Sequence, residues 1–160
     1  MTKRISGLVG GALALMLAGT ASAAGAPAVT DGYDWVMRVN EDRVSNAILA
    51  YEVDGTDDQP LNFTCEQGSD RVFAGISGGA PDLVAIDLES GDQRVRLTGT
   101  TDADELPTFT AQEIPATSPL FQAFATNGWL RMTADGAALD MAATASGKQA
   151  VLRFARFCAG

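Results

Sequence analysis

The sequence contains no histidine and only two cysteines. If the cysteines are bonded to each other, the side chains available for chemistry are carboxylates, hydroxyls and a few cations. Histidine is the commonest general base and the commonest metal ligand, so every catalytic triad built on it is excluded. The 20 acidic residues remain. Two carboxylates held roughly 5 to 9 Å apart can hydrolyse a glycosidic bond. A carboxylate-based hydrolase is therefore one hypothesis, although so many acids also form chance pairs.

The stretch Ser146-Gly147-Lys148 resembles the end of a phosphate-binding loop, Gly-x-x-x-x-Gly-Lys-Ser/Thr. Ala142 stands where that loop needs its first glycine, and Gln149 stands where it needs Ser or Thr. Because both positions fail, the motif predicts no nucleotide site. Ser146 and Gln149 instead fit a capping box, which begins a helix.

A second candidate site is a calcium loop. Asp102, Asp104 and Glu113 match the first, third and twelfth positions of an EF-hand loop. That loop needs glycine at its sixth position for a sharp turn, and this chain has Pro107 there. The pattern therefore predicts no calcium site. The sequence assigns no catalytic residue, no cofactor and no metal ligand.

The chain has two cysteines, Cys65 and Cys158. In an exported protein they are expected to form one disulfide, with free thiols or an intermolecular bridge as the alternatives. Closing so long a loop stabilises a fold by about 4 kcal/mol in the chain-entropy model. Leu61, Phe63 and Cys65 alternate along one expected strand, which places the thiol of Cys65 on the core side.

The first residues have the pattern of a secretory signal peptide. Lys3 and Arg4 supply positive charge, Ile5–Ala18 is apolar, and Ala21-Ser22-Ala23 is a small-x-small cleavage site. The apolar run is shorter than the roughly 20 residues that span a bilayer as a helix. We expect a cleaved signal peptide over 1–23, a flexible lead-in over 24–32 and a location in the periplasm or outside the cell. A retained N-terminal anchor is the alternative.

Hydrophobic periodicity predicts how the remaining residues are positioned: a single α+β domain over 33–160. We expect a mostly antiparallel sheet of about seven to nine strands, two short helices in the C-terminal third and one disulfide. The expected strands are Tyr33–Val39, Ala47–Val53, Leu61–Cys65, Arg71–Ile76, Leu83–Leu88, Gln93–Leu97, Thr108–Ile114, Trp129–Ala134 and Ala137–Ala143.

Three local signals complete this expectation. Ser118-Pro119 begins a helix and Asn127-Gly128 ends it. Asp135-Gly136 is suited to a two-residue hairpin turn. The polar stretch Thr98–Pro107 is expected to be an exposed loop.

Five residues are candidate contacts for a partner. Lys148, Arg153 and Arg156 fall within the last expected helix of an otherwise acidic chain, where they could receive an anionic partner. The alternative is that the helix dipole favours cations near a C-terminus. Trp35 and Trp129 could line a ligand groove, although a lone tryptophan on an alternating strand is more often part of the core.

The formal net charge of the chain is −9, and two of its cations, Lys3 and Arg4, lie in the expected leader. Such a surface repels nucleic acid and anionic lipid and favours a basic partner, although acidic balance is also common in secreted proteins. We therefore expect no nucleic-acid partner and no integral membrane segment after cleavage. The sequence does not predict the oligomeric state.

Two stretches carry a family resemblance: Leu61-x-Phe63-x-Cys65, and Gly147-x-x-x-Val151-x-x-Phe154-x-x-x-Cys158. Through them the chain resembles small two-cysteine periplasmic proteins of proteobacteria, and in layout the type VI secretion-associated proteins of the VasI/TagO type. The resemblance implies a disulfide and an accessory role in the envelope, and it assigns no catalytic residue. The stretch from Phe63 to Gly68 also resembles periplasmic lysozyme inhibitors, although their later Ser-Gly-aromatic signature is missing.

The leading hypothesis is therefore an exported periplasmic accessory or binding protein without catalytic activity, which contacts another envelope or secreted protein through its sheet face or its C-terminal helices. The first alternative is an inhibitor of a basic enzyme such as lysozyme, because the chain is acidic and a disulfide would make it rigid. The second is the carboxylate-based hydrolase, which needs two acids in a deep cleft.

Overall fold

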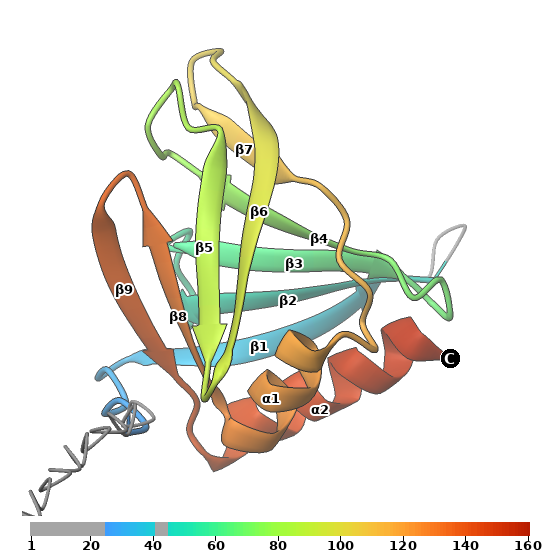
Figure 1. Ribbon diagram of the computed structural model, residues 1–160. Coiled ribbons are helices and arrows are strands. Elements are labelled where there is room, and N and C mark those ends of the chain that lie inside the picture. Colours follow the sequence, from blue (N-terminus) through green and yellow to red (C-terminus); the bar gives the residue numbers. More distant parts are fainter. Residues whose placement is uncertain (1–24, 41–44) are drawn as a thin grey trace, which may run out of the picture.

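The computed structural model describes residues 25–40 and 45–160, which form one antiparallel sheet of nine strands with two helices (Figure 1). The strands lie in the order β1-β2-β3-β4-β7-β6-β5-β8-β9. Their bounds are β1 (Tyr33–Asn40), β2 (Asn46–Val53), β3 (Leu61–Glu66), β4 (Val72–Ser77), β5 (Ala85–Ser90), β6 (Gln93–Asp102), β7 (Thr108–Ala111), β8 (Trp129–Ala134) and β9 (Ala137–Ala142). The expected signal peptide over 1–23 lies outside the described residues.

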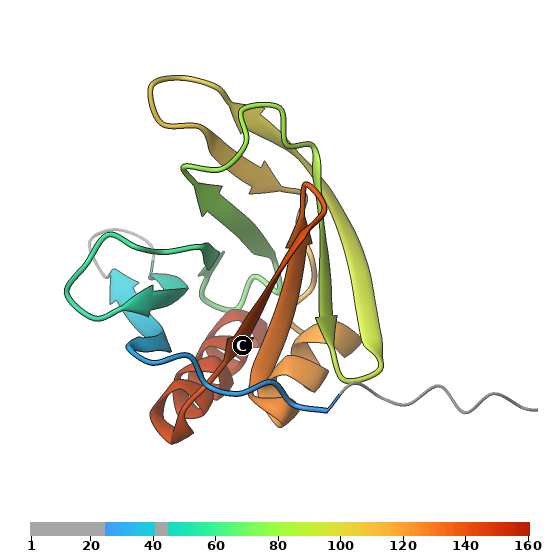
Figure 2. The same ribbon diagram turned by 90° about the vertical axis from the view of Figure 1, so that its left-hand side faces the viewer.

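The sheet bends so that β1–β4 run across β5, β6, β8 and β9 (Figures 1 and 2). β6 links the two parts, because Gln93–Thr98 pair with β5 and Gly99–Asp102 pair with β7, which in turn pairs with β4. A side-chain carbon at Gly99 would lie 2.2 Å from the carbonyl oxygen of Thr110. Only glycine therefore fits at this junction.

Two helices cover the inner side of the bent sheet. α1 (Pro119–Asn127) packs against β5, β6 and β8, and α2 (Ala145–Ala159) packs against β1 and β2. The indole N–H of Trp35 in β1 donates a hydrogen bond to the carbonyl oxygen of Met141 in β9 at 3.2 Å. This bond connects the two edge strands, so the sheet is nearly closed.

The core lies between the helices and the inner faces of both parts. In β2, Ala47, Leu49 and Tyr51 point inward and are no more than 2% exposed, as the period-2 alternation predicts. An aromatic cluster fills the centre, where the ring centroids of Trp35 and Phe124 lie 4.9 Å apart, edge to face. Its buried members are Trp35, Tyr51, Phe63, Phe121, Phe124 and Phe154.

The predicted fold class is confirmed, with a mostly antiparallel sheet, two helices in the C-terminal part and one disulfide. The Asp135-Gly136 hairpin is also confirmed, and both residues adopt positive φ, as a tight two-residue turn requires. α1 has the predicted ends: Ser118 caps its first turn, and Gly128 ends it in the left-handed conformation.

Of the predicted element boundaries that differ from the structure, two have a clear physical reason. The stretch Thr98–Pro107 was expected to be a loop, but β6 continues to Asp102 because β7 supplies partners for its backbone. The cap of α2 is Thr144 instead of Ser146, and the helix begins at Ala145. Asp34 explains the choice of cap, because its carboxylate accepts hydrogen bonds from the N–H of Thr144 at 2.9 Å and from its hydroxyl at 2.5 Å.

Candidate functional site

The outward face of β1–β4 is arranged in rows, because the strands pair in register and every second side chain points away from the core. One row consists of Arg38, Ile48, Thr64 and Phe73. The next row consists of Val36, Ala50, Asn62 and Gly75. Several of these outward side chains are apolar, whereas the solvent side of an antiparallel sheet is usually polar. This face is therefore a candidate for binding.

A groove with a volume of about 400 Å³ lies over the first row. We call it the outer groove, and the lining residues that matter here are Arg38, Ile48, Thr64, Glu66, Arg71 and Phe73. Ile48 and Phe73 are half-buried and form its apolar floor. Arg38 lies in β1 and Arg71 directly precedes β4, so with strands spaced about 4.8 Å apart their backbones are roughly 14 Å apart. The groove thus has an apolar centre and a cation at each side.

Arg38 is held in place by a buried acid. Glu52 is 1% exposed, and its carboxylate accepts hydrogen bonds from both terminal nitrogens of Arg38, one of them at 2.9 Å. The hydrogen bond to Glu52 raises the pKa of Arg38 above its ordinary value. A buried carboxylate is costly without a cation beside it, so this pair fixes one side of the groove. The Arg38 side chain is still 50% exposed and can meet a ligand.

Arg71 is held more loosely. Its Nε lies 2.5 Å from Oε2 of Glu113, and both side chains of this pair are more than half exposed. Its guanidinium carbon also lies 5.6 Å from the ring centre of Phe73, within the range of a cation–π contact. An exposed ion pair of this kind contributes little to stability, so Arg71 can exchange Glu113 for an acid on a ligand.

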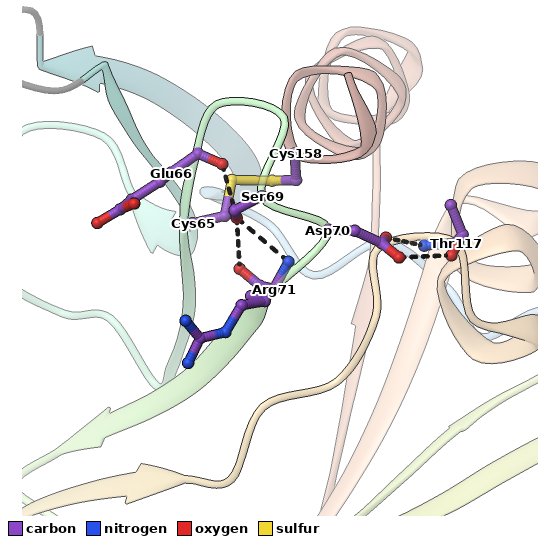
Figure 3. Close-up of a disulfide and its surroundings, with 7 residues drawn as sticks. All are labelled: Cys65, Glu66, Ser69, Asp70, Arg71, Thr117 and Cys158. Atoms are coloured by element: carbon purple, nitrogen blue, oxygen red, sulfur yellow. Dashed lines mark hydrogen bonds between the residues drawn. A yellow bond between two sulfur atoms is a disulfide. The ribbon is translucent and has the colours of Figure 1, made fainter.

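One half of the disulfide, Cys65, lines the outer groove, and Figure 3 shows the bond with its surroundings. Cys65 of β3 and Cys158 of α2 are bonded, with their Cα atoms 5.8 Å apart and 93 residues between them in sequence. The turn after β3 is fastened to the same helix, because the N–H groups of Gly68 and Asp70 donate to the carbonyl oxygens of Phe157 and Cys158 at 2.9 and 2.8 Å. The strand ends that carry Glu66 and Arg71 are therefore fixed to α2.

Asp70 fastens this turn to a second segment. Its carboxylate accepts hydrogen bonds from the N–H and the hydroxyl of Thr117, each at 2.9 Å (Figure 3). Asp70 has a φ of 53°, a conformation that is uncommon outside glycine. The turn is thus held by the disulfide, by two backbone bonds to α2 and by this side-chain pair. The groove has a preformed end.

The outward face of β5, β6, β8 and β9 is organised differently. Across four strands, one row reads Arg94, Glu89, Arg131 and Asp140, with opposite charges directly across from one another. Arg94 and Arg131 form ion pairs with Glu89 and Asp140, and Arg131 reaches Asp140 at 2.6 and 2.9 Å. We call this row the charge ladder. The hydrogen bond from Arg131 lowers the pKa of Asp140 below its ordinary value.

Two of the acids that line hollows of this face are parts of ion pairs. Glu89 is paired with Arg94, and Asp87 accepts a hydrogen bond from Arg96 at 2.8 Å. Within residues 25–40 and 45–160, no three acids or cysteines come together as ligands of a metal would.

The chain was compared with protein-family models, with curated proteins and with solved structures. None of the three comparisons finds a match. The resemblance to VasI/TagO-type proteins therefore stays a prediction. The described part of the chain has no helix that is both long and apolar enough to cross a membrane.

The structure places the predicted site residues at three different locations. Cys65 and Cys158 form the predicted bond. Trp35 is 1% exposed and Trp129 is 4% exposed, which favours the alternative that both tryptophans belong to the core. A partner on the surface meets neither indole ring.

The three predicted cations lie along α2 and not in the outer groove. Arg153 and Arg156 are exposed, whereas Lys148 is half-buried, and its stem lies beside Gly128. The structure therefore brings none of the five predicted contacts into the outer groove.

Sequence reasoning missed the groove residues Arg38, Ile48, Arg71 and Phe73. A signal was present, because Val36 and Ile48 are apolar at positions that alternate with the core residues of their strands. A strand that is apolar on both faces is either buried on both or carries a contact surface. That signal identifies the strands, but the groove also depends on which strands are neighbours.

Proposed function

We propose that this chain is an exported, non-catalytic binding protein of the bacterial envelope, and that the outer groove receives a segment of another envelope or secreted protein. The observation that carries the proposal is the apolar floor of Ile48 and Phe73 between two arginines. A volume of about 400 Å³ falls within the range of known ligand sites. The disulfide supports export, because such bonds persist in oxidising compartments.

The chemistry of the groove favours a peptide over a polar metabolite. Ile48 and Phe73 offer apolar area to one inserted side chain, and burying such a side chain contributes about 1.5 to 3 kcal/mol. Thr64 lies between these two residues, and Arg38 and Arg71 lie at the sides of the groove. All three can donate hydrogen bonds to a peptide's carbonyl and carboxylate oxygens. An apolar residue flanked by acceptors is therefore the expected motif.

The first experiment locates the contact in the native envelope. A photo-cross-linking amino acid replaces Ile48 in one variant and Ala138, an exposed residue of β9, in a matched control. We expect position 48 to give one reproducible protein adduct, and position 138 to give none. Identical adduct patterns at both positions would contradict the proposal.

The second experiment measures affinity for the partner so identified. Ile48→Asp places a charge on the floor of the groove and is expected to weaken binding at least tenfold, since the buried apolar contact is lost. Leu106→Asp is the control, because Leu106 is 62% exposed and lies in the loop between β6 and β7. Equal losses in the two variants would reject the groove as the site.

A second candidate function is inhibition of a basic enzyme such as lysozyme. Its supporting observation is the exposed loop after β2, which carries Asp54, Asp57 and Asp58. Acids gathered on a loop attract a cationic surface. Unchanged lysozyme turnover in a micromolar excess of this protein would end that proposal.

A further inference from the structure

The cations of the described chain fall into two groups. Each of the arginines on or beside the strands, namely Arg38, Arg71, Arg94, Arg96 and Arg131, forms an ion pair with an acid. Lys148, Arg153 and Arg156, all on α2, form none within residues 25–40 and 45–160. In a chain with 20 acids and 11 cations, unpaired cations gathered on one element need an explanation.

The sequence of α2 accounts for the missing partners. Its 15 residues include no acid, so no cation on it has an acidic neighbour one turn away. Arg153 and Arg156 are three residues apart, which places them side by side on the exposed surface of the helix. Like charges at this spacing destabilise a helix slightly. The arginine pair therefore does not stabilise α2.

The helix dipole explains only part of this arrangement. Its effect is confined to the last turn of a helix, where Arg156 lies. Arg153 lies before that turn, so the dipole does not account for it. A partner that supplies the missing negative charge accounts for both arginines.

We propose that the exposed side of α2 around Arg153 and Arg156 is a docking surface for an acidic segment of a partner protein. Charge screening favours a short segment over a membrane or a nucleic acid. Fields decay over about 8 Å at physiological salt, so a short segment interacts with the local arginines alone. An extended anionic surface meets the whole protein, whose net charge is −9.

The position of this surface fits the fold. The carbonyl oxygens of Phe157 and Cys158, in the last turn of α2, accept hydrogen bonds from the turn that precedes Arg71. The arginine pair and the outer groove are thus at the same end of the molecule, where β1 and α2 both end (Figure 1). The docking surface on α2 does not depend on the groove.

The test uses a fluorescein-labelled octaglutamate peptide as the probe and fluorescence anisotropy as the measurement. Arg153→Gln with Arg156→Gln is expected to weaken binding at least fivefold. The control is Gln112→Glu with Gln122→Glu, which changes the net charge equally at two exposed positions outside α2. We expect the control to weaken binding less than twofold. Because both arginines are exposed, the variants should keep the wild-type melting temperature.

Four results would overturn the proposal. The first is no binding of octaglutamate to the wild-type protein at low salt, and the second is an equal loss of affinity in the control variant. The third is binding to vesicles of three parts phosphatidylcholine and one part phosphatidylglycerol that depends on the same arginines, which would assign the surface to a membrane. The fourth is a dimer held together by this surface. Sedimentation equilibrium would then show a wild-type dimer that Arg153→Gln with Arg156→Gln dissociates, and the partner would be a second copy of the chain.

Discussion

The two outward faces of the sheet use the same ionic side chains in opposite ways. On β5, β6, β8 and β9, the arginines of the charge ladder stand directly across from acids on neighbouring strands. On β1–β4, Arg38 stands across from Ile48, and the acid that it binds is Glu52, four residues further along β2. The arginine therefore extends along the sheet to reach its partner.

This difference shows how register decides whether a surface is closed or open. Ion pairs that match the register neutralise one another locally and cover the strands beneath them. A pair that reaches two rows further along the sheet leaves the residue directly opposite uncovered, and here that residue is Ile48, which lines the outer groove. The charge ladder is therefore a solvated surface, and the outer groove is a surface that can bind.

The largest test of this contrast removes the bond that only the β1–β4 part has. Replacing both cysteines, Cys65→Ser with Cys158→Ser, is expected to lower the free energy of unfolding by about 4 kcal/mol, because the closed loop is long. Denaturant titration measures this. Hydrogen exchange should rise first in β3, β4 and α2, and later in β5 and β8. If hydrogen exchange rose equally in all strands, the disulfide would not stabilise β1–β4 and α2 more than the rest of the sheet.

The next test compares one substitution on each face. Arg38→Gln leaves Glu52 buried without its cation and is expected to cost about 2 to 3 kcal/mol, less than a fully buried pair because Arg38 is half exposed. Arg94→Gln breaks an exposed pair of the charge ladder and should cost under about 1 kcal/mol. Equal costs in urea unfolding would remove the distinction between the two faces.

A third test acts on the junction between the two faces. Gly99→Ala places a carbon against Thr110 and the ring of Phe109, and such overpacking typically costs about 1 to 3 kcal/mol. Gly136→Ala is the control, because its added carbon would have no neighbour within 4 Å, although its φ of +76° still strains the turn. If thermal unfolding shows Gly99→Ala to be the milder change, the close approach at the junction is not a constraint.

The smallest effect concerns Asp140 in the charge ladder. Arg131 lowers the pKa of Asp140 in the folded protein, so this pair stabilises the fold above the ordinary aspartate pKa of about 3.9. The contribution is lost as the pH falls through the lowered pKa. NMR titration should give a midpoint below the ordinary value for Asp140, and Arg131→Gln should raise it. An unchanged midpoint in that variant would show that the pair does not hold the carboxylate.

Much of the fold could be predicted because its signals are local. Alternation identified the strands, the Asp135-Gly136 pair identified a hairpin, and Leu61, Phe63 and Cys65 placed a thiol on the core side. Thr98–Asp102 was missed because only its pairing with β7 makes it a strand. Each of these signals lies in the residue types of one short stretch, whereas Thr98–Asp102 has no apolar residue and so gives no alternation.

The outer groove could not be predicted for the same reason. It needs Ile48 and Phe73 in the same row across three strands, and it needs Arg38 paired with a residue that register does not place opposite. Neither relation can be read from the chain without knowing the order of the strands. The tryptophans show the opposite error. Residue type alone makes Trp35 and Trp129 candidates for contact, but the fold buries both.

β6 belongs to both parts of the sheet, and this shared strand has a consequence for how the protein can be divided. A cut within Gln93–Asp102 would leave β5 and β7 with exposed backbone edges, and a cut after β9 would take away the helix that covers β1 and β2. Neither cut gives two fragments that each bury a core of their own. The two outward faces therefore belong to one folding unit.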